Sequence, residues 1–437
     1  MPLNVFVTDG DERPALAIVR ALGRSGLSVA VGSEKPACLS SSSKYCARHV
    51  VYPSPSRDPD GFERFLTTFI HREEPSVVLP VTDIATHSIC ALQELMGLRS
   101  ATAVPPLDAF ELVSDKRWLL ERAARCGIRV PRTHAVQGLS ALAAIENRIA
   151  YPAVVKPVRS RIRTRDGWLA TGVHYASCRG ELRNLFERTE YLATYPSLIQ
   201  ERIEGSGVGM FGLFDRGELI AEFAHVRLRE KPPSGGVSVL RVSVAVDPVL
   251  REAAIRLLGP LGWHGVAMIE FKQERRTGEL VLMEVNGRFW GSLQLAIDAG
   301  LDFPRLACDL ALGRRPPAMP PYKVGVRNRW LLGDLDHLLL RLFKSAEALH
   351  LPAGAPSRWR AAADFLQLSG RDLHYETISR DDPGPFAYEC RQYTRAFSES
   401  AARSIRHAFR GTSPSRSARP APDANRDTRS SRVPVSG

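Results

Sequence analysis

The feature of this 437-residue sequence that most constrains its fold is an alternation of short apolar runs with helical patterns in the first hundred residues. Residues 4–8 and 27–31 are apolar and β-prone, and residues 14–25 between them have helical periodicity. A further helix around 62–71 precedes the apolar run 76–80. This order predicts a βαβ-type α/β domain, in which ligands favour the carboxyl edge of a parallel sheet.

The turn after the first strand could suggest a dinucleotide site. It reads Asp9-Gly10-Asp11-Glu12, with one glycine where the GxGxxG fingerprint needs three and with extra carboxylates where a pyrophosphate would lie. We interpret it as a plain strand-to-helix turn.

The pattern changes from residue 113 onward, where a capped helix begins near Lys116 and ends at Gly127. We expect an α+β region with the following elements. Strands are predicted at 153–156, 197–201, 209–214, 219–225, 266–271 and 280–285, helices at 249–258 and 292–299, and a last long helix at 330–349.

Composition indicates a mostly folded protein with one unusual end. Half of the net charge of +12 lies in residues 401–437, which hold eight Arg and two Asp among Ser, Pro and Ala. Such a segment cannot bury enough apolar surface to order itself, so we predict a disordered tail. It has no aromatic residue beyond Phe409, which argues against RNA binding through the tail.

The cysteines and the hydropathy pattern bear on location. The seven cysteines are scattered without a CxxC pair, which suggests reduced thiols in a cytoplasmic protein. The N-terminus does not resemble a signal peptide, and no window approaches 18 uninterrupted apolar residues, so we predict no export and no membrane span.

The most informative stretch joins two apolar strands across the turn 275–278. Glu284 and Asn286 project to one side because alternate strand residues share a face, and Glu270 joins them if the strands pair. Three hard oxygen donors can hold Mg²⁺ together with substrate phosphates. Arg288 follows on the same face and offers a guanidinium to a phosphate. Solvated charges on an exposed strand are the alternative for each residue alone.

Other segments carry weaker signals of the same kind. Lys156 ends a buried strand, where its ammonium needs an anion such as a triphosphate, and Lys116 at a helix start is a second candidate. A basic stretch at 225–231 leads into a Gly-Gly loop and then Arg241, which suits a mobile lid over an anionic substrate or a plain exposed hairpin. The apolar strand ending in 200–205 could read an adenine edge through its backbone.

The order of these motifs resembles the ATP-grasp superfamily over roughly residues 1–315. The resemblance rests on DK at 115–116, VVKP at 154–157, QERIEG at 200–205, the PSGG loop, IEF at 269–271 and MEVNGRFWGS at 283–292. It implies a pre-ATP-grasp Rossmann-like α/β domain at 1–105 and a two-subdomain ATP-grasp domain at 106–315. A helical extension at 316–400 and the tail at 401–437 complete the expected organisation.

The resemblance also implies roles for single residues. Lys116 and Lys156 would contact the phosphates of ATP, and Arg288 would stabilise the acyl phosphate, with Lys156 and Arg241 as further catalytic candidates. Mg²⁺ or Mn²⁺ would bind Glu270, Glu284 and Asn286. Adenosine would bind along the segment that contains Gln200, Glu201, Arg202, Ile203 and Glu204.

Two departures from the family pattern stand out. The loop 158–164 lacks the glycines that many relatives use to cradle phosphates, and it carries arginines that could replace those backbone contacts. Val208 stands where relatives often place a carboxylate toward the ribose, for which Glu204 is a substitute.

We therefore expect an ATP-dependent ligase that activates a carboxylate as an acyl phosphate and passes it to an amine or another nucleophile. The expected partners are small-molecule carboxylates and amines, with no clear nucleic acid, and the sequence leaves the oligomeric state open, a homodimer included. The alternatives are a non-catalytic ATP sensor of the same fold and an RNA-binding protein acting through the basic tail.

Overall fold

The computed structural model describes residues 4–410 except 99, 317 and 353. Contacts divide the chain into two compact units, Met1–Cys390 and Arg391–Gly437. In the second unit, residues up to 410 continue α14 (Gly384–Arg410), so that part of the expected tail is helical. The rest of the expected tail, 411–437, lies outside the described residues. The predicted domain boundaries within the first unit stay predictions.

A four-stranded parallel sheet begins the first unit, as the sequence predicts, with the order β3-β2-β1-β4. Its strands are β1 (Val5–Val7), β2 (Val29–Ser33), β3 (Arg48–Val51) and β4 (Val77–Leu79), and its helices are α1 (Arg13–Arg24), α2 (Pro59–Glu73) and α3 (Asp83–Met96), with a 3₁₀ turn η1 (Ser40–Ser42). The turn after β1 needs Gly10, because a Cβ there would lie 2.4 Å from Val31 Cγ1.

Two helices connect this sheet to the rest of the chain, α4 (Leu107–Ser114) and α5 (Lys116–Arg125). Asp115 caps α5 by accepting a hydrogen bond from the backbone N–H of Trp118 at 3.0 Å. Gly127, with φ of 73°, follows the end of α5 in the left-handed region that favours glycine. Both ends therefore lie where the sequence signals place them.

A small antiparallel sheet follows, with the order β5-β10-β6-β9. It is built from β5 (Thr133–Val136), β6 (Ala153–Pro157), β9 (His174–Ala176) and β10 (Ser197–Glu201), packed with α6 (Gly138–Ile145), η2 (Glu146–Arg148), α7 (Arg179–Arg188) and α8 (Glu190–Thr194). A separate hairpin leaves it between β6 and β9, formed by β7 (Arg161–Thr164) and β8 (Gly167–Ala170).

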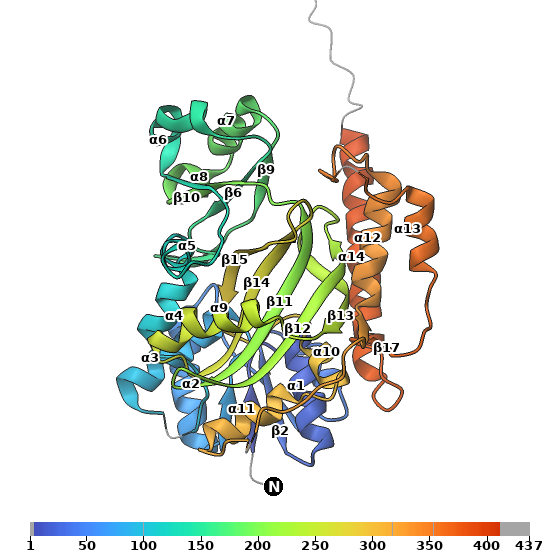
Figure 1. Cartoon of the computed structure of the whole chain (residues 1–437). Helices are drawn as coiled ribbons and strands as arrows, with labels where there is room; N and C mark the ends of the chain where they lie inside the picture. Colours follow the sequence, from blue (N-terminus) through green and yellow to red (C-terminus); the bar gives the residue numbers. More distant parts are fainter. Residues whose placement is uncertain (1–3, 99, 317, 353, 411–437) are drawn as a thin grey trace, which may run out of the picture. The chain divides into compact units, whose positions relative to one another are not determined.

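The largest sheet has seven strands in the order β15-β14-β11-β12-β13-β16-β17, and Figure 1 shows its long strands side by side. They are β11 (Gly205–Asp215), β12 (Glu218–Lys231), β13 (Val237–Val244), β14 (Gly265–Glu274), β15 (Leu280–Asn286), β16 (Arg327–Arg329) and β17 (Leu373–Tyr375). Alternate residues enter two different cores. Phe211 and Phe223 face α1 and the N-terminal sheet, whereas Met210 and Ile269 face α4, α5 and α9 (Pro248–Leu258).

The remaining elements are mostly helical. A 3₁₀ turn η3 (Gly259–Leu261), α10 (Leu293–Asp298) and α11 (Phe303–Ala311) precede the C-terminal α12 (Leu331–Phe343) and α13 (Arg358–Phe365). The segment expected to be helical also contributes the short strands β16 and β17. The predicted helix to residue 349 ends earlier, at Phe343, because the hydroxyl of Ser345 accepts the N–H of Ala348 at 3.1 Å and starts a separate turn.

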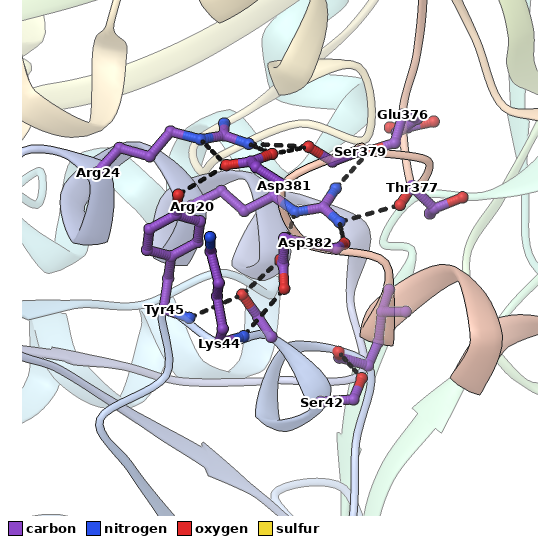
Figure 2. Close-up of polar contacts among 12 residues, drawn as sticks. Arg20, Arg24, Ser42, Lys44, Tyr45, Glu376, Thr377, Ser379, Asp381 and Asp382 are labelled. Carbon is purple, nitrogen blue, oxygen red and sulfur yellow. Dashed lines mark hydrogen bonds and ion pairs between the residues drawn. The ribbon is translucent and has the colours of Figure 1, made fainter.

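The segment after β17 docks on α1 through a buried arginine, shown in Figure 2. Arg20 donates to the Asp382 carboxylate at 2.8 Å and to the backbone carbonyl of Thr377 at 3.0 Å, and both charged side chains are 2% exposed. Asp382 also accepts the Ser43 hydroxyl at 2.7 Å. The C-terminal segment is thus attached to the N-terminal α/β layer by satisfied buried polar groups.

Candidate functional site

Glu270 on β14 and Glu284 on β15 are direct cross-strand neighbours, as the sequence predicts for strands that pair across the turn. Met268 pairs with Asn286 in the same ladder, and a register shift follows Glu270. Asn286 donates its amide to Glu284 at 3.2 Å. Two carboxylates and one amide oxygen therefore lie together on one part of the sheet, with the donor chemistry that suits a hard divalent cation.

Two buried lysines converge on Glu284 from other elements. Lys116, at the start of α5, lies 3.8 Å from the Glu284 carboxylate and donates to the Ser160 hydroxyl at 2.6 Å. Lys156 is 8% exposed at the end of β6, and within the described part of the chain its ammonium makes no hydrogen bond or ion pair. Burial first, with Lys116 nearby, lowers the pKa of Lys156 to about 8, although Glu284 opposes that shift. A buried cation without a partner suits an anionic ligand.

The two glutamates differ in electrostatic environment. Burial raises the pKa of Glu270 above its ordinary value. For Glu284 burial acts in the same direction, but Lys116 and Lys156 outweigh it, and the pKa of Glu284 lies below its ordinary value. The cation that faces Glu270 is Arg227.

Arg227 on β12 is a residue that the sequence reasoning missed. Its guanidinium lies 2.6 Å from Glu270 and 3.0 Å from Glu230, and it donates to the carbonyl of Gly236 in the Gly-Gly loop at 3.2 Å. A Cβ at position 207 would lie 2.7 Å from the Arg227 Cδ, so the glycine of β11 makes room for this side chain. The sequence shows the basic run before the loop, but it does not show that Arg227 pairs with Glu270.

Arg288 follows the metal-ligand candidates but points toward the N-terminal layer. Its Nε lies 2.9 Å from the Asp83 carboxylate at the start of α3, and it donates to the carbonyl of Phe289 at 3.0 Å. Another guanidinium N–H is 3.5 Å from the Asn286 oxygen. The ion pair between Arg288 and Asp83 therefore links the candidate site to the carboxyl edge of the parallel sheet.

Arg241, the other catalytic candidate, has different neighbours. It is fully buried on β13 and lies 2.8 Å from Glu376 in the segment after β17. It also donates to the side-chain oxygen of Asn328 at 2.5 Å and to the carbonyl of Ser238 at 3.0 Å. The structure gives Arg241 no ion pair or hydrogen bond with Glu270, Glu284 or Arg288 among the described contacts.

The predicted adenosine segment begins at the end of β10. Gln200 is buried and donates to the Thr133 hydroxyl at 2.9 Å, and Glu201 accepts from the Arg132 backbone N–H at 2.9 Å and its side chain at 2.7 Å. Arg202 donates to the carbonyl of His350. Glu204 is exposed. The side chains of Gln200, Glu201 and Arg202 are thus held by neighbouring protein groups rather than directed at one point.

Ile203 offers its backbone in this segment. Its carbonyl accepts the Lys272 ammonium at 3.2 Å, and within the described residues its N–H makes no hydrogen bond. Lys272, two residues after Glu270 on β14, was missed by the sequence reasoning, although the i, i+2 spacing places both side chains on one face. The backbone of Ile203 thus offers an N–H donor next to a carbonyl acceptor. A purine can form hydrogen bonds with such a pair of backbone groups.

A pocket whose empty space of about 580 Å³ includes open solvent adjoins Glu284 and Asn286. The arginine-rich loop after Lys156 forms one wall as the β7–β8 hairpin, with Arg159, Arg161 and Trp168 lining the pocket. The departure from a glycine-rich loop therefore has a structural counterpart, a hairpin that carries side chains toward the site.

The described residues set two limits on other functions. They contain no group of three or more His, Cys, Asp or Glu side chains placed to hold a metal, so cation binding would use Asn286 and ligand oxygens beside the two glutamates. They also contain no helix with the length and apolarity that crossing a membrane requires. None of the seven cysteines, all of which are described, forms a disulfide.

Comparisons with known proteins bear on the family and on the fold. A family model described as ATP-grasp in the biosynthetic pathway with Ter operon matches residues 195–333. The carbamoyl phosphate synthase large chain of Archaeoglobus fulgidus is 26% identical over 309 residues, which is 67% of this chain and 27% of that protein. The chain thus spans about a quarter of the length of this curated relative.

Solved structures show the same fold at low identity. The L-amino acid ligase from Bacillus licheniformis superposes with a TM-score of 0.54 at 19% identity, covering 71% of this chain and 75% of that one. The biotin carboxylase domain of Hydrogenobacter thermophilus 2-oxoglutarate carboxylase, a complex with MgADP and bicarbonate, gives 0.59 at 15%, covering 75% and 74%. The family model over residues 195–333, the sequence relative and the shared fold all support the ATP-grasp superfamily, which this chain resembles in sequence and in fold.

Proposed function

We propose that this chain is an ATP-dependent ligase that activates a carboxylate as an acyl phosphate and transfers the acyl group to an amine. The observation that carries the proposal is the direct pairing of Glu270 with Glu284, with Asn286 and two buried lysines beside them. The MgADP complex of the Hydrogenobacter relative supports a magnesium nucleotide as the ligand. Its bicarbonate, and the name of the Bacillus ligase, support a carboxylate substrate.

The residues present suit MgATP. Glu270, Glu284 and Asn286 would hold Mg²⁺ or Mn²⁺ through oxygen atoms, and Lys116 and Lys156 would neutralise the phosphates. The unpaired ammonium of Lys156 is the test of this fit, because a buried charge is costly until it meets an anion. When bound, MgATP supplies the phosphoryl group that activates the carboxylate.

The protein's own groups would act by position and charge. Arg288, oriented by Asp83, would stabilise negative charge that develops on the reacting oxygens. The N–H of Ile203, which makes no hydrogen bond within the described residues, would donate to the adenine edge, with Gln200, Glu201, Arg202 and Glu204 shaping that end of the site.

The experiment that tests the proposal is ADP formation from ATP with panels of carboxylates and amines, each alone and combined. The proposal predicts that ADP appears in amounts that depend on both substrates and on magnesium. Tight ATP binding without ADP formation for any combination would instead support a nucleotide sensor of the same fold. Binding of RNA that disappears when residues 411–437 are removed would support the other alternative.

A further inference from the structure

The small sheet β5-β10-β6-β9 has a hydrophobic core of its own. Val155, Leu182 and Phe186 are fully buried in this core, which is separate from the two cores on the faces of the large sheet. A unit with its own core can move as a body when the contacts at its border open. Because β6 carries Lys156, the border contacts of the small sheet control access to the candidate phosphate site.

Tyr175 on β9 makes one of these border contacts. It pairs with Val154 across β9 and β6, so it lies on the face of the small sheet that also carries Lys156. Its hydroxyl donates to the carbonyl of Ser234 at 3.4 Å, in the Gly-Gly loop at 232–236. Burial raises the pKa of Tyr175, so the hydroxyl keeps the proton that it donates.

The Gly-Gly loop is also attached to the candidate metal site. Arg227 donates to the carbonyl of Gly236 at 3.2 Å and pairs with Glu270 at 2.6 Å. A Cβ at Gly235 would lie 3.3 Å from the hydroxyl oxygen of Tyr175, and Gly235 has φ of 129°, so a glycine is needed where the loop approaches the small sheet. The loop thus joins the small sheet to the strands that carry the two glutamates.

The C-terminal extension reaches Tyr175 through His350. The two rings stack with their centroids 5.4 Å apart and their planes 28° from parallel. Arg202, which precedes the adenine candidate Ile203, donates to the carbonyl of His350 and lies 5.5 Å from the centroid of the Tyr175 ring. His350 lies beyond residues 1–315, the stretch whose motifs resemble the ATP-grasp superfamily.

The turn that presents His350 is closed by its own hydrogen bonds. The N–H of His350 donates to the carbonyl of Glu347 at 2.9 Å, and the N–H of Leu351 donates to the carbonyl of Ala346 at 2.9 Å. Leu349 anchors the turn and is 5% exposed. His350 has φ of 45°, which is uncommon for a residue other than glycine and persists where the surroundings hold it. The turn therefore fixes the His350 ring in the ligand-free protein.

We propose that His350 is a positioning residue that latches the small sheet to the Gly-Gly loop, so that a nucleotide enters and leaves only when the stack on Tyr175 opens. The inference rests on the proposed function, because it takes MgATP as the ligand between Ile203 and Glu270. His350 acts through Tyr175 and is not among the residues proposed to bind ATP. Weakening the latch should therefore raise the association and dissociation rates by similar factors and leave the affinity nearly unchanged.

The test follows the binding of the fluorescent analogue mant-ATP, with Mg²⁺, to the full chain by stopped flow. His350→Asn removes the ring and keeps a residue that tolerates positive φ. It should raise both rate constants roughly three- to tenfold, which corresponds to the loss of one aromatic pair. Tyr175→Phe keeps the ring stack and removes the hydroxyl that reaches Ser234, and it should raise both rate constants by a smaller factor.

Matched controls lie on neighbouring elements. Tyr195→Phe removes a hydroxyl at the end of α8, and His374→Asn removes an exposed imidazole from β17. Both should bind mant-ATP with the rate constants of the wild type. Thermal unfolding without nucleotide shows whether each variant is folded. If His350→Asn folds poorly, Tyr175→Phe alone carries the test, because it changes a single oxygen atom.

Two outcomes would overturn the latch. A rise in the dissociation rate constant alone would show that His350 and Tyr175 support a nucleotide contact instead of gating entry. Unchanged rate constants in both variants would show that the extension does not hold the site closed. The ligase proposal is judged separately by ADP formation. Faster exchange without ADP from any substrate pair would remove the ligase and leave the latch, whereas ADP formation with unchanged exchange would do the reverse.

Discussion

Glu270 and Glu284 face each other across β14 and β15, and each is balanced by cations from a different part of the chain. Arg227 from β12 contacts Glu270 at 2.6 Å, whereas Lys116 from α5 lies 3.8 Å from Glu284. Like charges placed directly opposite on a sheet repel each other. The cations offset that repulsion in the ligand-free protein, and a divalent metal would do so in the loaded one.

Removing Arg227 should therefore make the stability of the protein depend more strongly on a metal ion bound to Glu270 and Glu284. We expect Arg227→Met to lower the free energy of unfolding by about 3 to 5 kcal/mol, because a buried carboxylate loses its partner. Added Mn²⁺ should restore stability in this variant more than in the wild type. The measurement is thermal unfolding with and without Mn²⁺. Arg251→Met breaks an ion pair with Glu222 on the same sheet and is the control. An equal Mn²⁺ shift in all three proteins would contradict a metal role for Glu270.

Lys156 should contribute to ATP affinity and not to the stability of the ligand-free protein. Lys156→Met keeps most of the length and removes a buried charge that has no partner among the described residues, so the stability of the ligand-free protein should hold or rise. ATP affinity should fall by about 1.5 to 3 kcal/mol, typical of a hydrogen bond to a charged group. Titration calorimetry measures the ATP affinity. Lys344→Met, which removes an exposed lysine, is the control and should leave the ATP affinity unchanged. If the variant is strongly destabilised without ligand, yet its remaining folded molecules bind ATP with normal affinity, then the role of Lys156 is structural.

The same lysine predicts a pH dependence with a definite sign. Its pKa of about 8 lies below the ordinary value of 10.5, so between these values the unfolded chain binds more protons than the folded one. The contribution of Lys156 to the free energy of unfolding should therefore rise with pH across this window, and this rise should be missing in Lys156→Met. Because a bound phosphate favours the charged form, ATP binding near pH 8.5 should take up protons. Calorimetry in buffers of different ionisation enthalpy detects that uptake, and its absence would place the phosphates elsewhere.

The docking of the C-terminal segment on α1 gives a matched pair of ion pairs, both drawn in Figure 2. Arg20 and Asp382 are each 2% exposed, whereas Arg24 and Asp381 are 37% and 43% exposed. Arg20→Met should cost about 3 to 5 kcal/mol, since Asp382 remains buried without its partner. Arg24→Met should cost at most about 1 kcal/mol. Urea denaturation compares the two variants, and equal losses would contradict the structural account of this contact.

Much of the fold was predictable because the signals are local. Apolar periodicity located most strands and helices, and the short turn 275–278 predicted that Glu270 and Glu284 would pair. The end of α12 was missed because Ser345 forms its own turn within an otherwise apolar run.

The parts that sequence could not predict depend on long-range packing. Arg227 reaches Glu270 only because Gly207 leaves space on the strand between them. Arg241 pairs with Glu376, which lies in a segment more than a hundred residues later and joins the sheet beside β17. The strands β16 and β17 are too short to give a recognisable alternation, so an added sheet edge was read as helical sequence.

Glu270 and Glu284 are proposed to bind the metal of a catalysed ATP reaction, and Glu284→Gln tests this proposal most directly. ADP formation would be followed at limiting magnesium, with the substrate pair that supports turnover in the wild type. The account predicts a loss of about 10² to 10³-fold with the fold preserved, because one fixed charge at the reacting phosphate is removed. Glu279→Gln, an exposed residue just before β15, should keep full turnover. Unaltered ADP formation in Glu284→Gln would contradict the account.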